Sequence, residues 1–161
     1  MKNKLVSRIP WREKIENVKD FRIIDVPLRM QKRFGKGKML IPRPLDLEAI
    51  IKKVRKGKLL TKSKLREKLS FDFKADVTCP ITSGIFMRII SEAAEEELEA
   101  GKKKVTPYWR VINNDGSLNQ NFPGGDKRQA EYLKREGHQI EKTNKGKLLR
   151  VCDFEKRSVS F

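Results

Sequence analysis

The length and composition of the chain favour one compact domain with an appended arm. Its 161 residues are too few for a multidomain protein. Hydrophobic and charged residues each make up 37% of the chain, which allows a modest core under a strongly charged surface and argues against full disorder. Lys and Arg number 38 against 21 Asp and Glu, giving a net charge of +17. A polyanion, with nucleic acid foremost, is therefore the expected partner.

Several other classes of protein fit the sequence poorly. No run of 18 apolar residues is present and no apolar segment follows the basic start at residues 1–4, which predicts neither a membrane span nor a signal peptide. We therefore expect a cytoplasmic, nucleoid-associated protein. Cys79 and Cys152 cannot form a disulfide framework, and with His138 as the single histidine they do not complete a zinc site. No metal or cofactor is expected.

The positive charge is concentrated in the N-terminal part of the chain. Residues 1–70 carry 22 Lys and Arg against 7 Asp and Glu, whereas residues 71–161 carry 16 against 14. This asymmetry indicates an electrostatic footprint for nucleic acid in the first part. Residues 1–43 lack a sustained hydrophobic period and contain one strand-like run at residues 21–26. We expect a basic N-terminal arm over residues 1–43 and a folded domain over residues 44–161.

Two helices are predicted next along the chain. The first begins at Asp46 as its N-cap and is closed by Gly57, with apolar residues at helical spacing between them. The second begins at Thr61, buries Leu65 and Leu69, and carries basic residues on its outer face. Within the arm, residues 35–37 predict a basic turn rather than a phosphate loop, because the third glycine is missing.

A third helix is predicted from the cap-like sequence at residues 78–80 to Gly101. One face of it carries apolar residues, namely Ile81, Ile85, Ile89 and Ala93. Five glutamates lie between residues 92 and 99, and they would repel phosphate. We therefore expect only the first half of this helix to face DNA.

The rest of the chain predicts short β elements and one more helix. A strand is expected over residues 108–112 and a turn over residues 113–116. A helix capped by Asp126 and ended by Gly137 follows, and then a hairpin over residues 139–154 that turns at residues 144–146. The expected fold class is α+β, a small winged-helix-like domain with a helix-turn-helix and short β hairpins.

The second and third predicted helices, joined by a loop and followed by a β element, form a helix-turn-helix-like pair. Such a pair places its later helix in a DNA groove while the earlier helix crosses the backbone. The residues expected to contact DNA are polar or basic and lie on the second helix, just before it, or on the first half of the third helix. They are Lys58, Thr61, Lys62, Ser63, Lys64, Arg66, Thr82, Ser83 and Arg88.

A set of motifs resembles the C-terminal domain of alkylguanine-DNA alkyltransferases. These motifs are Thr-Pro-Tyr-Trp-Arg-Val-Ile at residues 106–112, Asp-Gly-Ser-Leu at 115–118, Gly-Gly at 124–125 and Lys-Arg-Glu-Gly at 134–137. Residues 57–61 are similar to the start of the family's helix-turn-helix. The resemblance covers about residues 45–140, and it implies a DNA-binding domain that acts on alkylated guanine.

The sequence departs from the family at the reactive positions. Tyr108 stands where the family has its nucleophilic cysteine, and Trp109 stands where it has the activating histidine, while Glu136 matches the orienting glutamate. The resemblance thus implies a protein similar to the alkyltransferase-like proteins, which bind flipped alkylated bases and recruit excision repair. It implies a base pocket of Tyr108, Trp109, Arg110 and Glu136, places Thr82 near the family's intercalating arginine, and makes a repair protein a partner of this monomer.

Alternatives remain at most of these positions. Tyr108 either floors the pocket or packs in the core, Arg110 either reads phosphate or forms a structural pair, and Glu136 is either held by a partner or lies on the surface. Cys79, at a helix start, is either a displaced nucleophile or a packing residue. The functional alternatives are an alkyltransferase that uses Cys79 and an RNA- or ribosome-binding protein.

Overall fold

The computed structural model describes residues 7–143 and 146–161 of the chain. Its elements in chain order are α1 (Trp11–Glu16), β1 (Arg22–Asp25), α2 (Leu28–Phe34), β2 (Lys38–Ile41), α3 (Pro44–Ile51), β3 (Leu60–Thr61), α4 (Lys62–Asp72), β4 (Val77–Thr78), α5 (Pro80–Glu99), η1 (Tyr108–Arg110), β5 (Val111–Ile112), α6 (Gly125–Arg135), β6 (Ile140–Lys142), β7 (Leu149–Val151) and η2 (Phe154–Arg157). Within the described part, no helix is long and apolar enough to cross a membrane. The predicted α+β class is confirmed.

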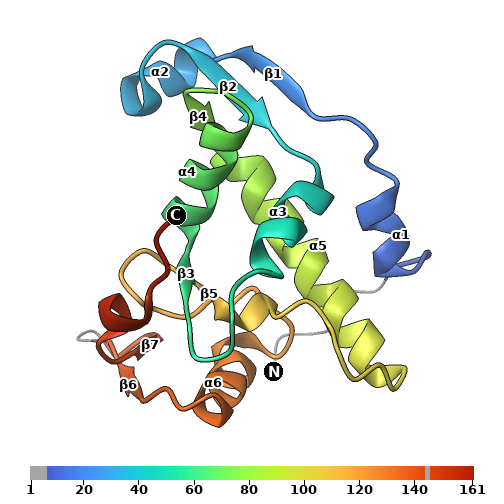
Figure 1. The fold of residues 1–161 in the computed structure, drawn as a ribbon, viewed down its shortest axis with the longest axis vertical. Helices are drawn as coiled ribbons and strands as arrows, with labels where there is room; N and C mark the ends of the chain where they lie inside the picture. The colour runs from blue at the N-terminus through green and yellow to red at the C-terminus, as the bar shows by residue number, and fades with distance from the viewer. Residues whose placement is uncertain (1–6, 144–145) are drawn as a thin grey trace.

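The longest helix, α5, runs diagonally through the molecule, and α1, α3 and η1 pack against it (Figure 1). It begins with Pro80 directly after its N-cap Cys79, where a proline costs no hydrogen bond and has its φ angle already set for the helix. The main core contains Met87, Ile90 and Ala93 of α5. Its C-cap is Ala100, directly before Gly101. The predicted start and end of this helix are confirmed.

The apolar face predicted for the start of α5 is wrong in one respect. Ile81 and Ile85 are 58% and 55% exposed, while Ala93 is buried and Ile89 is half-buried. The helix turns its Met87 and Ile90 face to the core instead. The two exposed isoleucines lie on the half of α5 that was expected to face DNA.

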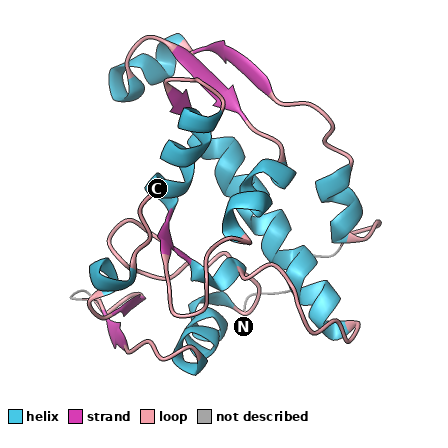
Figure 2. Cartoon of the chain, viewed as in Figure 1, coloured by secondary structure: helices cyan, strands magenta, loops and turns pink. Residues whose placement is uncertain are grey.

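The described residues form three small sheets, two of which join distant parts of the chain (Figure 2). The first has the order β1-β2-β4, with β1 antiparallel to β2 and β4 parallel to β2. Leu60 of β3 pairs with Val111 of β5 in a parallel pair. The third sheet is the hairpin β6-β7, in which Ile140 faces Val151. The turn predicted for this hairpin at residues 144–146 lies partly outside the described residues. The predicted winged-helix arrangement of helices and hairpin stays a prediction.

Residues 1–43 contain more regular structure than the sequence pattern predicts. The strand-like run is present as β1, but the helices α1 and α2 and the strand β2 were not predicted. Trp11, Ile15 and Leu40 are buried in the same core as α5. The helices have six and seven residues, too short to show a helical period over a window of 11–18 residues. The basic start at residues 1–4 lies outside the described residues.

Helix boundaries differ from the prediction where a nearby residue caps the helix instead. Arg43 is the N-cap of α3, and Asp46 lies in its first turn, where its carboxylate accepts a hydrogen bond from the Arg43 backbone N–H at 2.9 Å. Helix α3 ends at Ile51, well before Gly57. Gly124 is the N-cap of α6, where a φ of 76° favours glycine. The expected strand at residues 108–112 is a 3-10 turn, η1, followed by the short strand β5, because the Arg110 N–H bonds back to the Pro107 carbonyl.

Candidate nucleic-acid interface

Helix α4 is the first helix of the predicted pair, and its position is fixed at both ends. The Thr61 side chain accepts a hydrogen bond from the Lys64 N–H, which confirms the predicted cap. Leu65 and Leu69 are buried in the main core. Near the other end, the Thr78 hydroxyl lies 2.7 Å from that of Ser70. The connection from α4 to α5 is longer than a tight turn because it contains β4, which joins the first sheet.

The residues expected to contact DNA fall into two groups. Thr61 and Ser83 are buried, and the Ser83 hydroxyl donates to the Cys79 carbonyl at 2.7 Å, so both hydroxyls serve the fold. The others are exposed or half-buried on α4, on the first half of α5, or on the loop before α4. They are Lys58, Lys62, Ser63, Lys64, Arg66, Thr82 and Arg88. The Ser63 N–H is used by Asn114.

An open groove lies along the first half of α5. Its volume is about 500 Å³, and it brings a cation from α4 together with exposed apolar and polar groups. Its lining is Trp11, Lys62, Pro80, Ile81, Gly84, Ile85, Met87, Arg88, Ile89, Asn119 and Asn121. Of the predicted residues, only Lys62 and Arg88 line it. The two asparagines belong to the loop before α6, and the sequence pattern did not identify them because no local period links that loop to α5.

Tyr108 lies in the core rather than in the groove. Its side chain is 0% exposed and meets the Phe122 ring edge-on at 5.0 Å. Its hydroxyl donates to the Glu95 carboxylate at 2.6 Å. Burial, together with the charge of Glu95, raises the pKa of Tyr108 above its ordinary value. The phenol is therefore held in its neutral form.

Glu136 is held inside the protein by the two residues that precede β5. Its carboxylate accepts hydrogen bonds from the Trp109 indole N–H at 3.0 Å and from the Arg110 guanidinium at 2.8 and 2.9 Å. Its side chain is 8% exposed. Burial alone would raise the pKa of Glu136, but these hydrogen bonds and the Arg110 charge hold it below the ordinary value. The surface alternative for Glu136 is wrong.

The Arg110 guanidinium has a second internal partner. It donates to the Val54 carbonyl at 2.5 Å, at the end of the segment that follows α3. Arg110 therefore joins α6, through Glu136, to the α3 region. This is the structural pair that was one of its two alternatives.

Cys79 is a packing residue in this structure. It is 8% exposed and belongs to a small apolar cluster with Val26 and Met39. Its sulfur accepts a hydrogen bond from the Thr82 hydroxyl at 3.3 Å. The single histidine, His138, is buried just after α6 and lines a different pocket, together with Cys152.

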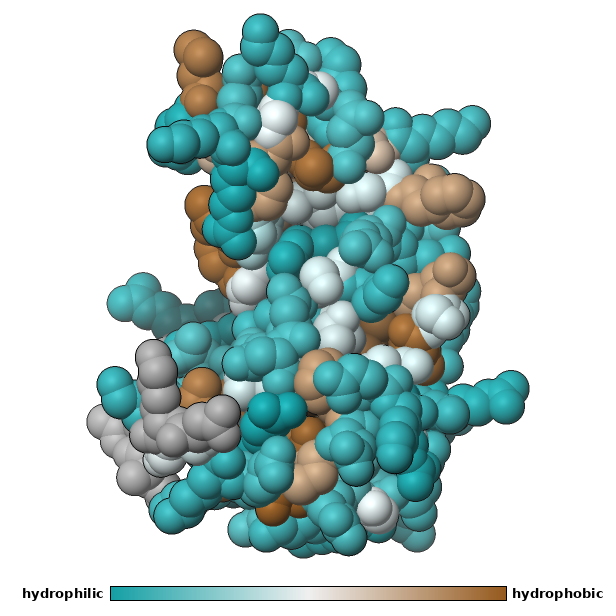
Figure 3. Space-filling view, turned by 90° about the vertical axis from the view of Figure 1, so that its left-hand side faces the viewer, coloured by the Kyte–Doolittle hydropathy of each residue, from teal (hydrophilic) through white to brown (hydrophobic). Residues whose placement is uncertain are grey.

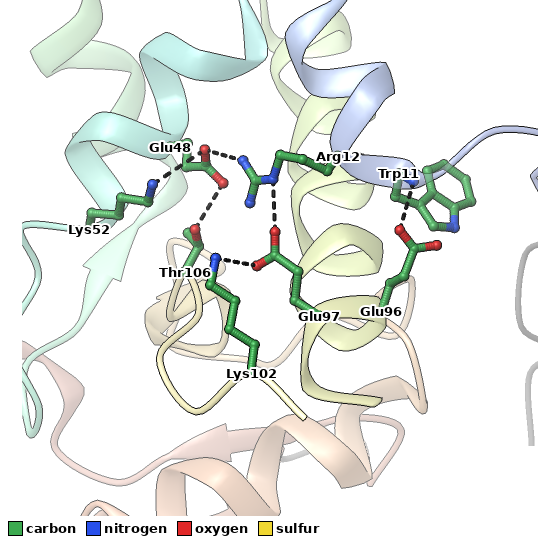
Figure 4. Close-up of polar contacts among 8 residues, drawn as sticks. All are labelled: Trp11, Arg12, Glu48, Lys52, Glu96, Glu97, Lys102 and Thr106. Atoms are coloured by element: carbon green, nitrogen blue, oxygen red, sulfur yellow. Dashed lines mark hydrogen bonds and ion pairs between the residues drawn. The ribbon is translucent and has the colours of Figure 1, made fainter. Parts of the chain in front are cut away.

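The acidic half of α5 is used for internal contacts (Figure 4). Glu96 accepts from the Trp11 N–H, and Glu97 from the Arg12 guanidinium at 2.8 Å. Arg12 also donates to Glu48 of α3 at 2.7 Å. These contacts attach α1 to α3 and α5, so Glu96 and Glu97 anchor the N-terminal segment.

The surface on the side of α2, α4 and the C-terminal hairpin is mostly hydrophilic, with separate apolar patches (Figure 3). Among the cations of α4, Lys62 lines the α5 groove. The candidate interface therefore consists of two parts. The outer face of α4 supplies cations, and the first half of α5 supplies a groove with apolar and polar lining.

Two solved structures share this fold. One is S. pombe Atl1 in complex with damaged DNA containing O6-carboxymethylguanine, at 17% identity and a TM-score of 0.53. The other is S. pombe ATL in complex with DNA, at 17% identity and a TM-score of 0.51. Each comparison covers 73% of this chain and 94% of the other. No family model and no curated protein matches the sequence. The chain thus shares an α+β fold with these two DNA-bound proteins, which confirms the predicted α+β class and agrees with a helix-turn-helix domain.

Proposed function

We propose that the protein binds duplex DNA through α4 and the first half of α5 and senses alkylated bases without transferring the alkyl group. The observation that carries this proposal is the groove on α5, bordered by Lys62 of α4, in a fold shared with two proteins crystallised on DNA, one of them on damaged DNA. Lys62, Lys64 and Arg66 of α4 would bind backbone phosphates, which position a protein on the duplex without reading sequence.

The first half of α5 would enter a groove of the DNA. Ile81 and Ile85 project from it, with Arg88 one turn further along. Proteins that bend or open a duplex often insert apolar side chains between base steps and hold the backbone with cations. Exposed isoleucines beside an arginine suit this task and would help to extrude a damaged base.

Two observations support a non-enzymatic role. The Tyr108 hydroxyl is buried and neutral, donating to Glu95, so it is a poor acceptor of an alkyl group. The Trp109 indole only donates, to Glu136, and it cannot accept a proton as a base would. A pocket role of Tyr108 would require its buried ring to move. The proposal therefore rests on the α5 groove, which is already open.

We further propose that the protein acts as a monomer in the cytoplasm, at the nucleoid, and passes the damaged site to a repair protein.

The experiment that tests DNA binding and damage sensing is a titration of three labelled ligands: a 20-bp duplex, the same duplex with one central O6-alkylguanine, and a structured RNA of equal length. We expect the alkylated duplex to bind most tightly and the RNA most weakly.

A charge-reversal variant tests the surface itself. Lys62→Glu with Lys64→Glu should weaken binding to both duplexes, because each lysine faces the backbone. The matched control is Lys103→Glu with Lys104→Glu, which makes the same charge change at two exposed lysines beyond the end of α5. Equal binding by wild type and the α4 variant, with folding intact, would contradict the proposal. Tighter binding of RNA than of either duplex would favour the RNA-binding alternative.

A further inference from the structure

Helix α2 presents cations on one side and packs with the other. Met30 and Phe34 are half-buried against the apolar cluster that contains Met39 and Cys79. Arg29, Lys32 and Arg33 are exposed, and the seven residues of α2 include no acidic side chain. Because Cys79 is the N-cap of α5, this packing places α2 beside the start of the helix that carries the groove.

The placement of α2 relative to α4 is set by the first sheet (Figure 1). Strand β2 follows α2 and pairs with β4, with Leu40 opposite Thr78. The Thr78 hydroxyl donates to the Arg66 carbonyl of α4 at 2.9 Å, and the Cys79 N–H donates to the Leu40 carbonyl at 2.9 Å. Hydrogen bonds therefore join the first sheet, which follows α2 in the chain, to the backbone of α4 and to the start of α5.

Like charges meet where these two helices approach each other. Burial and the nearby charge of Arg33 lower the pKa of Arg66, and burial and the charge of Arg66 lower the pKa of Lys62. Among residues 7–143 and 146–161, none of these three cations forms an ion pair with a carboxylate. A row of cations thus runs from the groove, at Lys62, across Arg66 to Arg33 on α2.

Holding unpaired cations side by side costs free energy, and a polyanion laid along the row would remove this cost. A duplex is the polyanion that fits, because each strand carries one phosphate per about 3.4 Å of helix axis and the row continues directly from the α5 groove. A compact anion would neutralise only one or two of the cations. The α2 cations are held on a folded helix, so little backbone ordering is needed on binding.

We propose that α2 is a second backbone-binding element that grips duplex DNA beyond the helix-turn-helix footprint, through Arg29, Lys32 and Arg33. This inference rests on the proposed function, since it extends the same DNA surface. It gives a role to the part of residues 1–43 that contains α2. The helix lengthens the contact with the phosphate backbone and adds affinity that does not depend on base sequence or damage.

The test is the salt dependence of duplex binding by the triple variant Arg29→Gln, Lys32→Gln, Arg33→Gln in the full chain. Each lost phosphate contact should reduce the slope of log K against log salt by about 0.9, so three contacts reduce it by about 2.7. Affinity near 0.15 M salt should fall on the order of 100-fold. The fall should be equal for plain and alkylated 20-bp duplexes, since α2 would touch only the backbone.

The matched control removes the same three charges elsewhere, as Lys102→Gln, Lys103→Gln, Lys104→Gln after the end of α5. This variant should keep the wild-type slope, which separates a local contact from a general loss of net charge. Urea unfolding checks that both variants fold, and the α2 triple leaves Met30 and Phe34 in place. If the triple variant is destabilised, Arg29→Gln with Lys32→Gln alone should still reduce the slope by about 1.8.

The outcomes separate this inference from the proposed function. Duplex binding by wild type with an unchanged slope in the α2 variant would overturn the inference and leave the proposed function standing. Absence of salt-dependent duplex binding by wild type would overturn both. Tighter binding of a 20-bp RNA duplex than of the DNA duplex, lost in the α2 variant, would assign the row of cations to RNA and overturn the inference as stated.

Discussion

Replacing Tyr108 distinguishes a core residue from the floor of a base pocket. The ring is fully buried in the main cluster, in edge-on contact with Trp109, Phe122 and Tyr132. Tyr108→Ala would empty a site of this size in a close-packed interior, and large aromatic truncations of this kind cost about 3–5 kcal/mol of unfolding free energy. This is a large fraction of the 5–15 kcal/mol typical of a domain.

The hydroxyl can be tested without emptying the site. Tyr108→Phe keeps the ring and removes one donor from the buried Glu95 carboxylate, which retains Tyr132 at 2.8 Å and Arg128 at 3.2 Å. A hydrogen bond to a charged group contributes about 1.5–3 kcal/mol, so we expect a loss in this range. Tyr132→Phe is the matched control. It removes a donor to the same Glu95 oxygen from a half-buried ring, and it should cost less.

The assay has two parts: unfolding, by urea and by heat, and duplex affinity measured well below the melting temperature. A loss of 1 kcal/mol lowers Tm by about 2–4 °C in a domain of this size, so both Tyr108 variants should be clearly separated from wild type. Where the variants are folded, the ratio of affinities for alkylated and plain duplex should equal that of wild type.

A particular result would refute the core assignment. If Tyr108→Ala unfolded like wild type but lost about 1–3 kcal/mol of affinity for the alkylated duplex alone, the ring would be stacking on an extruded base. An unfolding free energy of Tyr108→Phe equal to that of wild type would separately show that the bond to Glu95 contributes nothing measurable.

Four further predictions concern salt dependence, alkyl transfer, pH dependence and the ion pair of Glu136. Duplex binding by wild type should weaken with salt at a slope of about −4 to −5 if only the helix-turn-helix contacts four to six phosphates, and more steeply if α2 adds its own contacts; a slope near zero would contradict backbone binding. DNA with a radiolabelled alkylguanine should leave no label on the protein, and label that Cys79→Ser abolishes would establish an alkyltransferase. Unfolding free energy should fall as the pH drops below about 4.5. The pKa values of Glu48 and Glu136 in the folded protein are held below their ordinary value of 4.5. The two carboxylates therefore stabilise the fold above that pH, and this stabilisation is lost as they protonate. Glu136→Gln should make this fall smaller and cost about 3–5 kcal/mol at pH 7 by leaving Arg110 buried without its charge partner; a pH profile equal to that of wild type would contradict this.

Local sequence signals determined the two helices of the candidate interface. The Thr61 cap and the spacing of Leu65 and Leu69 fixed α4, and the sequence from Cys79 to Pro80 fixed the start of α5. These signals act between residues a few positions apart, through capping hydrogen bonds and helical periodicity. The excess of positive charge, together with the order of the motifs from residue 106 to residue 137, also indicated a DNA-binding helix-turn-helix.

Tertiary structure alone decided what most site residues do. Tyr108 became a core residue through Glu95, and Glu136 became an internal acceptor through Trp109, 27 residues away. The same holds for α2, because the role proposed for its cations depends on a sheet that aligns residues 39–40 with residues 77–78. Burial and ion pairing depend on which distant segments come into contact, and a local sequence pattern does not report such contacts. For this reason the sequence predicted the helices of the candidate interface, while only the fold could show which of their faces are exposed.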